Sequence, residues 1–117
     1  MQLLLKRVYD PAEPTDGFRV LVDRLWPRGV SKERAAIDLW AKDVTPSTEL
    51  RKAWHAASAD EWNKYAVEYR HQLEHESAPA VAQLRETLAP HAIVTLVYAS
   101  HDTVHNHVRV LMEVLSE

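Results

Sequence analysis

Four basic residues fall beside predicted strand ends or a predicted helix start: Arg7, Arg24, Arg28 and Lys32. A guanidinium group binds a carboxylate or phosphate through two parallel hydrogen bonds, and the free amides of a helix start add partial positive charge. These residues predict a binding pocket for a small anion. The alternative is a structural network in which Arg24 pairs with Asp10, Asp16 or Asp23.

A second group near the end of the chain could move a proton: His101, Asp102, His105, Asn106 and His107. We take His107 as a candidate general acid or base, because imidazole titrates close to neutrality, and Asp23 as a second catalytic candidate that could handle the proton instead. Asp102 and Asn106 are candidate ligand contacts. In the alternative, Asp102 caps the final helix while Asn106 and His107 fix the preceding loop.

His101 and His105 are four residues apart, a spacing that lets two imidazoles on a helix meet one divalent metal. The glutamate that a zinc protease motif carries between them is absent, so we assign no metal site. Two aromatic residues complete the ligand contacts. Trp26 could stack on a base or sugar, or else close the core, and Tyr98 could offer its hydroxyl to the pocket, or else be core itself.

Two apolar runs predict the strands that position these residues. Residues 20–22 read Val-Leu-Val and end in Asp23-Arg24, and residues 92–99 read Ala-Ile-Val-Thr-Leu-Val-Tyr-Ala. Such runs are typical of strands buried on both faces of a parallel sheet, whose carboxyl ends usually hold the ligand. Residues 3–9 predict a further strand, and the proline-rich loop after it leaves its orientation open.

Between these two apolar runs, hydrophobic residues recur at helical spacing. We expect a helix of about ten residues from the Ser31 cap to Lys42-Asp43, and a second starting at Thr45-Pro46. A capping box at residues 58–61 opens a third that runs to about His75, a fourth covers 79–89, and Asp102 caps a last one carrying Val104. The pattern predicts an α/β fold with a small, mainly parallel sheet of three to four strands and about five helices.

Composition limits the class of protein further. The 117 residues, 46% of them hydrophobic, suit a single α/β domain over residues 1–117. A net charge of −3 argues against a nucleic-acid partner. The absence of cysteine excludes disulfides, thiolate zinc sites and a cysteine nucleophile. Neither a signal peptide nor an apolar run of about 20 residues is present, so we expect a cytoplasmic protein with no membrane partner.

Four segments together resemble a known family. They are Lys-Arg-Val-Tyr-Asp-Pro at 6–11, the block at 16–30 that contains Asp-Arg-Leu-Trp-Pro-Arg-Gly, Pro-Ser-Thr-Glu-Leu-Arg-Lys at 46–52, and residues 95–107. The chain is similar over almost its whole length to the YeaO-like branch of domain-of-unknown-function family 488. The resemblance implies a bacterial source and an α/β domain, with no agreed reaction.

A longer branch of that family is similar at two places. Its Asp-Val-Arg strand end corresponds to Val22-Asp23-Arg24, and its Cys-His-Arg segment corresponds roughly to Asn106-His107-Val108. The longer branch also has a helix between its first two strands, which favours a parallel first strand here. Because this chain lacks the cysteine, thiol chemistry cannot be carried over.

Three functional classes follow. The first is an enzyme acting on a small anionic substrate, held by Arg24 and Arg28, with His107 or Asp23 handling a proton. The second is a module that binds a nucleotide or similar anion without catalysis. The third is a nucleic-acid or protein interaction domain, which the acidic helices disfavour. No motif for a cofactor is present, so we expect none.

Overall fold

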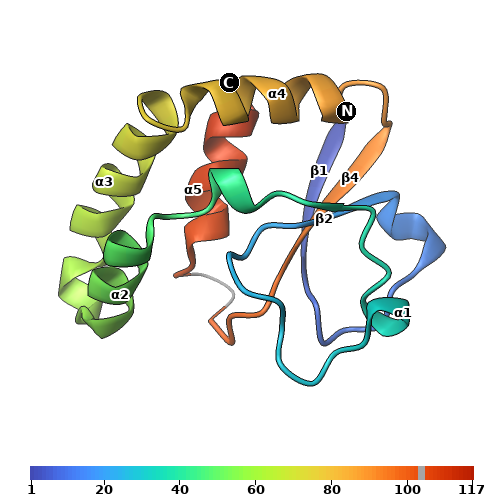
Figure 1. Ribbon diagram of the computed structural model, residues 1–117, viewed down its shortest axis with the longest axis horizontal. Helices are drawn as coiled ribbons and strands as arrows, with labels where there is room; N and C mark the ends of the chain where they lie inside the picture. Colours follow the sequence, from blue (N-terminus) through green and yellow to red (C-terminus); the bar gives the residue numbers. More distant parts are fainter. Residues whose placement is uncertain (103–104) are drawn as a thin grey trace.

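The computed structural model describes residues 1–102 and 105–117. In this part of the chain four strands form one all-parallel sheet in the order β1-β4-β2-β3 (Figure 1). The strands are β1 (Gln2–Arg7), β2 (Phe18–Leu21), β3 (Leu39–Trp40) and β4 (Ile93–Tyr98). The helices are α1 (Lys32–Ala35), α2 (Thr48–Ala56), α3 (Trp62–Glu74), α4 (Ala78–Leu88) and α5 (His107–Leu115). The predicted α/β class, with its parallel sheet and five helices, is confirmed.

The first strand takes the parallel orientation. It pairs with β4, from Gln2 opposite Ile93 to Arg7 opposite Tyr98, and not with β2, the next strand along the chain. β4 therefore lies between β1 and β2, which explains why its residues 94–98 are almost completely buried. The two apolar runs were predicted to be strands covered on both faces, and the structure confirms this for both.

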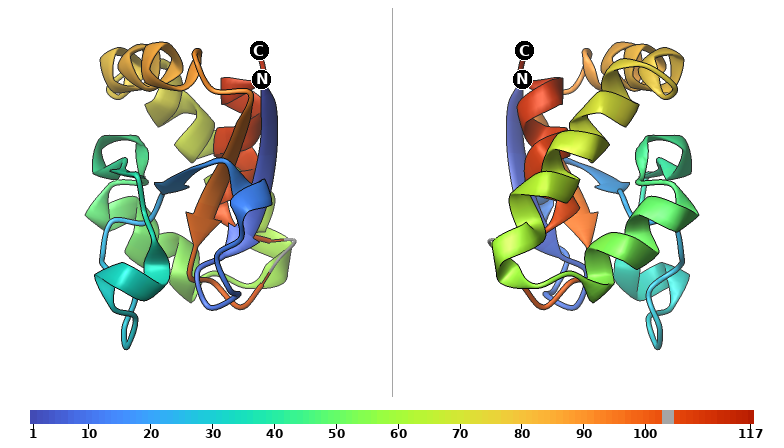
Figure 2. Two further views of the ribbon diagram at one scale, coloured as in Figure 1. Left: turned by 90° about the vertical axis from the view of Figure 1, so that its right-hand side faces the viewer. Right: turned by 90° about the vertical axis from the view of Figure 1, so that its left-hand side faces the viewer.

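Helices α2, α3, α4 and α5 gather on one face of the sheet. Figures 1 and 2 show α2 and α3 on one side, with α5 between α3 and the strands, whereas α1 and the loop after β1 lie on the other side. Alternate strand residues such as Val20, Leu96 and Leu5 point into the main core beneath the helices. A smaller core of Val8, Val30, Ala35 and Val97 lies on the opposite face.

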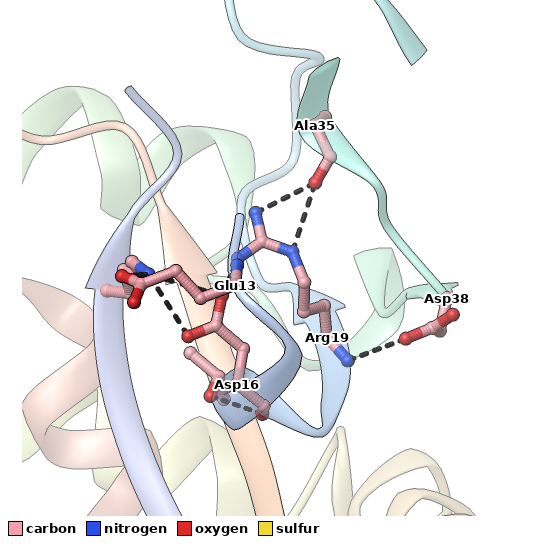
Figure 3. A network of polar contacts seen from close by, with 7 residues as sticks. Glu13, Asp16, Arg19, Ala35 and Asp38 are labelled. Atoms are coloured by element: carbon pink, nitrogen blue, oxygen red, sulfur yellow. Dashed lines mark hydrogen bonds and ion pairs between the residues drawn. The ribbon is translucent and has the colours of Figure 1, made fainter. Parts of the chain in front are cut away.

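A charged network also lies on this second face (Figure 3). Asp16 is 6% exposed and lies in a 3₁₀ turn, Pro14–Asp16. Its carboxylate accepts from the Arg19 guanidinium at 2.6 Å and from the Lys6 ammonium at 3.1 Å. Arg19, only 3% exposed, also donates twice to the Ala35 carbonyl. The network ties β1, β2 and α1 together across the sheet.

The helix predicted from Ser31 to Lys42-Asp43 was wrong beyond its first turn. Ser31 does cap α1, accepting from the Arg34 amide at 3.1 Å. Ala36 then adopts the left-handed conformation, with φ of 50°, and ends the helix after four residues. Leu39 and Trp40, which match helical spacing, instead pair with Val20 and Leu21 as β3. Tertiary pairing outweighs a local preference when an edge of the sheet is available.

The second helix begins later than expected. Thr45 was predicted as its cap, but the Thr45 hydroxyl donates to the Lys42 carbonyl at 2.6 Å and closes a 3₁₀ turn, Lys42–Val44. Ser47 caps α2 instead, accepting from the Leu50 amide at 3.2 Å. Pro46 is therefore outside the helix, and its carbonyl is free to accept a side chain.

The remaining helix predictions hold in outline. The capping box of Ser58 and Glu61 is present and leads into α3, and α4 lies close to the predicted range. Asp102 was wrongly predicted as the cap of the last helix. Asn106 caps α5, accepting from the amides of Val108 and Arg109 at 3.1 and 3.3 Å. Val104 lies outside the described residues.

Within residues 1–102 and 105–117, no helix combines the length and the apolar character needed to cross a bilayer.

Candidate functional site

The ends of β2 and β4 meet the start of α5 at the carboxyl edge of the sheet. Asp23 follows β2, and its Oδ2 accepts the amide of Ala99, the residue after β4, at 2.8 Å. His107 is the first residue of α5, and its Nε2 lies 2.7 Å from the Val22 carbonyl and 3.5 Å from Asp23 Oδ1. Both side chains are slightly under one-fifth exposed. The structure thus brings together the two catalytic candidates, Asp23 and His107, whose contact the sequence did not predict.

The contact with Val22 decides which imidazole nitrogen carries a proton. A carbonyl oxygen only accepts hydrogen bonds, so Nε2 of His107 must be the donor. In the neutral ring Nδ1 is then the acceptor. Nδ1 is therefore the atom of this side chain that could take up a proton from a bound molecule.

The surroundings of Asp23 disfavour its charged form. Burial raises the pKa of the Asp23 carboxyl above its ordinary 3.8, while the charge of His107 and the Ala99 amide act in the opposite direction. Burial, and the nearby charge of Asp23, also raise the pKa of the Tyr69 hydroxyl. The Tyr69 ring meets the His107 ring edge-on, with centroids 5.9 Å apart. The pair is therefore partly shielded from water, and the His107 ring packs against an aromatic ring.

Arg24 is brought to the same edge, two residues beyond the carbonyl that binds His107. Its Nε donates to the Pro46 carbonyl at 3.2 Å. Among the described residues neither of its terminal nitrogens makes a hydrogen bond, and no carboxylate pairs with it. The alternative in which Arg24 pairs with Asp10, Asp16 or Asp23 is therefore not what the structure shows, since Asp16 pairs with Lys6 and Arg19.

Helix α3 fixes the loop that holds Arg24. The Tyr69 hydroxyl donates to the Val44 carbonyl at 2.5 Å, and the Gln72 amide donates to the Thr45 carbonyl at 3.0 Å. Gln72 also accepts from the Ser47 amide at 2.9 Å. The helical spacing of Tyr69 predicts packing alone, and no motif in the sequence includes Gln72. A glutamine on the inner side of a helix, facing a Thr-Pro turn, was the available signal.

The Arg7 side chain binds the loop that follows β4. Its Nε donates to the Ser100 carbonyl at 2.9 Å, and one terminal nitrogen contacts the Ala99 carbonyl and His101 Nδ1 at 3.4 and 3.2 Å. Arg7 thus anchors the loop after β4 to the end of β1. His105 lies against the Trp62 ring, and its backbone amide donates to Asp102 Oδ1 at 2.7 Å. His101 and His105 both precede α5, so they do not share a helical face.

The other residues predicted to contact the ligand lie apart from one another or are used elsewhere in the fold. Tyr98 is 3% exposed and belongs to the main core, and Asn106 is occupied as a helix cap. Trp26 packs on the smaller core and donates its indole N–H to the Val30 carbonyl at 2.7 Å. Arg28 and Lys32 are exposed, on the loop and on α1. Since α1 is a single turn, its dipole adds little to an anion site.

In the described part of the chain, no group of three or more histidine, aspartate or glutamate side chains could hold a metal ion. The groups available for chemistry at the carboxyl edge are therefore the Arg24 guanidinium, on the loop after β2, and the largely buried carboxyl–imidazole pair.

Comparison with known proteins identifies the family of this chain. The model of a family described as "Inactive DUF488-N3 subclade" matches residues 2–117. The chain is 44% identical to the uncharacterized protein YeaO of Escherichia coli strain K12, over 97% of this chain and 96% of that protein. It is 41% identical to the uncharacterized proteins Mb3100c of Mycobacterium bovis and Rv3073c of Mycobacterium tuberculosis, over 94% of this chain and 90% of each.

No solved structure gives a significant match to the chain. The family model and the relatives in E. coli and the mycobacteria agree with the resemblance of the four sequence segments. The chain therefore belongs to the YeaO-like part of family 488, in the group described as the Inactive DUF488-N3 subclade.

Proposed function

We propose that this protein binds a small carboxylate- or phosphate-bearing molecule at the carboxyl edge of its sheet, through Arg24, and does not turn it over. The observation that carries the proposal is how the Arg24 side chain is held and what it leaves unpaired. Its guanidinium is oriented by the Pro46 carbonyl, is half-buried, and has no carboxylate partner among the described residues. A positioned guanidinium with both terminal nitrogens available matches the bidentate geometry of carboxylate and phosphate.

Binding without catalysis agrees with two further features. The chain has no cysteine at the position where the longer branch of the family carries one, and the matching subclade is described as inactive. The Asp23 carboxyl faces Ala99 and His107, so it is not positioned by its contacts to neutralise Arg24. The anion contact and the carboxyl–imidazole pair are separate parts of one edge.

Arg24→Met is expected to weaken binding of the ligand by about ten- to a hundredfold, because a hydrogen bond to a charged group contributes about 1.5–3 kcal/mol. Phosphorylated and carboxylated metabolites are screened by thermal shift, and each hit is then measured by calorimetry. The control is Arg85→Met. Arg85 also donates to a main-chain carbonyl, that of Val114, but it lies on α4 at the other end of the sheet (Figure 1). Equal binding by wild type and Arg24→Met would contradict the proposal.

The carboxyl–imidazole pair favours a second candidate, an enzyme that moves a proton of the bound anion. His107 Nε2 is fixed on the Val22 carbonyl, which leaves Nδ1 to act as the base. This candidate shares the anion contact and differs only in what His107 does.

His107→Gln distinguishes the two candidates. Glutamine can still donate an N–H to the Val22 carbonyl but cannot titrate. If the protein is an enzyme, turnover of the bound compound falls by about 10²- to 10⁴-fold while affinity is retained. For a binding module we expect no turnover in wild type and similar affinity in both proteins, measured by calorimetry and by NMR of the compound over hours.

A further inference from the structure

A small hollow lies beside the edge strand β3 and does not include Arg24. It has a volume of about 190 Å³ and is lined by residues of the Trp-Pro loop, α1 and the β3 strand: Trp26, Lys32, Ile37, Asp38, Leu39 and Trp40. β3 is the last strand of the sheet, so no strand covers this side of it. A volume below the roughly 300 Å³ of drug-sized sites suits a single ring with a short polar group.

The two tryptophans provide an apolar wall. Their rings meet edge to face, with centroids 5.4 Å apart and planes at 70°. Both indole N–H groups are already used: Trp26 donates to the Val30 carbonyl and Trp40 to the Asp23 carbonyl, each at 2.7 Å. The Lys42 ammonium lies over the Trp40 ring, 3.9 Å from its centroid, so what the rings offer to a ligand is their remaining carbon surface, which favours an apolar or aromatic group.

Two opposite charges line the same hollow. Lys32 and Asp38 are both exposed, and within the described residues no ion pair joins them. Asp38 Oδ2 accepts the Arg19 amide at 2.9 Å, which holds the side chain in place and leaves Oδ1 available. A ligand with only a negative charge would meet repulsion from Asp38, and one with only a positive charge would meet repulsion from Lys32.

We propose that this hollow binds a small zwitterion of the α-amino-acid type with an apolar or single-ring side chain. The carboxylate of the ligand pairs with Lys32, its ammonium group with Asp38, and its side chain packs on Trp26 and Trp40. This inference is independent of the anion contact at Arg24.

The test uses L-phenylalanine as the probe and follows the indole N–H signals of the full chain by NMR. The chain has four tryptophans, and Trp26→Phe and Trp40→Phe assign the two signals of the hollow. We expect these two signals to shift saturably with L-phenylalanine. Phenylacetate, which lacks the ammonium group, and phenethylamine, which lacks the carboxylate, should each bind at least about tenfold more weakly.

Two variants locate the charges. Lys32→Met keeps the apolar stem, and Asp38→Asn keeps an oxygen to accept the Arg19 amide. Each is expected to weaken L-phenylalanine binding by at least about tenfold, whereas Lys52→Met, on the exposed side of α2, should leave it unchanged. The proposal is overturned if neither indole signal moves at about 20 mM probe, or if phenylacetate or phenethylamine binds as well as L-phenylalanine.

Discussion

Gly17→Ala is expected to lower the free energy of unfolding by at least about 3 kcal/mol. Gly17 has a φ of +65° and a ψ of −134°, a conformation that costs an L side chain about 1–3 kcal/mol. A Cβ at this position would also lie 2.3 Å from the carbonyl oxygen of Ile93, the first residue of β4. Main-chain atoms of a central strand cannot move away cheaply, so the clash adds to the strain.

Gly29→Ala is the matched control for this prediction. Gly29 has a similar φ of +78°, but a Cβ there would meet no atom within 4 Å. Gly29→Ala should therefore lower the free energy of unfolding only by the conformational strain, about 1–2 kcal/mol. Urea unfolding of the two variants measures both values. Equal losses would show that the close approach of Gly17 to β4 contributes nothing.

The central strands could be predicted because burial on both faces leaves a continuous apolar run in the sequence. Residues 20–22 and 94–97 are examples, and both are almost fully buried. β3 could not be predicted in this way. It has two residues, and Leu39 and Trp40 also fit helical spacing with Ala36. What decides between helix and strand there is the free edge of β2, which is a tertiary feature.

The helix caps illustrate a related limit. Thr45, Ser47, Asp102 and Asn106 are all good cap residues by type, and the sequence alone does not say which amide each will face. Thr45 donates to a carbonyl and Asp102 binds the His105 amide, so Ser47 and Asn106 become the caps. Moving the cap to Asn106 places His107 at the first turn of α5, where it reaches the end of β2.

The candidate site was predictable only where the residues follow strand ends directly. Asp23 and Arg24 lie at the carboxyl edge because they come just after β2, whereas His107, at the start of α5, reaches this edge through the Val22 carbonyl. Arg7 was predicted in the same manner, but carbonyls of the loop after β4 occupy its guanidinium. Whether an arginine binds a ligand or a loop depends on which carbonyls the fold leaves nearby, and the spacing of residues does not contain this information.

The buried charged network around Asp16 was not predicted because its members are dispersed along the sequence. Lys6 lies in β1, Asp16 in a 3₁₀ turn and Arg19 in β2, and only the pairing of both strands with β4 brings them together. A charged residue inside the buried run Phe-Arg-Val-Leu was the one signal available. An arginine in such a position requires a partner, because an isolated buried charge is very costly.

Asp16→Asn is expected to destabilise the protein by about 3–5 kcal/mol, because it leaves Arg19 buried without its counter-charge. The control is Glu13→Gln. Glu13 also pairs with Lys6, at 2.9 Å, but its side chain is 60% exposed. Surface pairs of this kind contribute at most about 1 kcal/mol. Urea unfolding at neutral pH compares the two losses, and similar values would contradict the burial argument.

A double variant separates two contributions to the loss of stability: the loss of the ion pair and the penalty of the charge that is left unpaired. Asp16→Asn with Arg19→Met removes both buried charges, while the methionine retains much of the apolar stem. The double variant should be less destabilised than the sum of the single changes, because the penalty of an unpaired guanidinium is removed. Additive losses would mean that Asp16 and Arg19 act independently, despite their contact at 2.6 Å.

The same network predicts how stability changes in acid. Burial by itself would raise the pKa of Asp16, but hydrogen bonds from the Glu13 amide, Lys6 and Arg19 lower it below the ordinary 3.8. The folded protein therefore binds this proton less readily than the unfolded chain, so the carboxylate stabilises the fold above pH 3.8 and the contribution is lost as pH falls through the lowered pKa. Asp16→Asn should flatten this part of the stability curve, measured by urea unfolding below about pH 5. An unchanged acid dependence would assign the loss to other carboxyls.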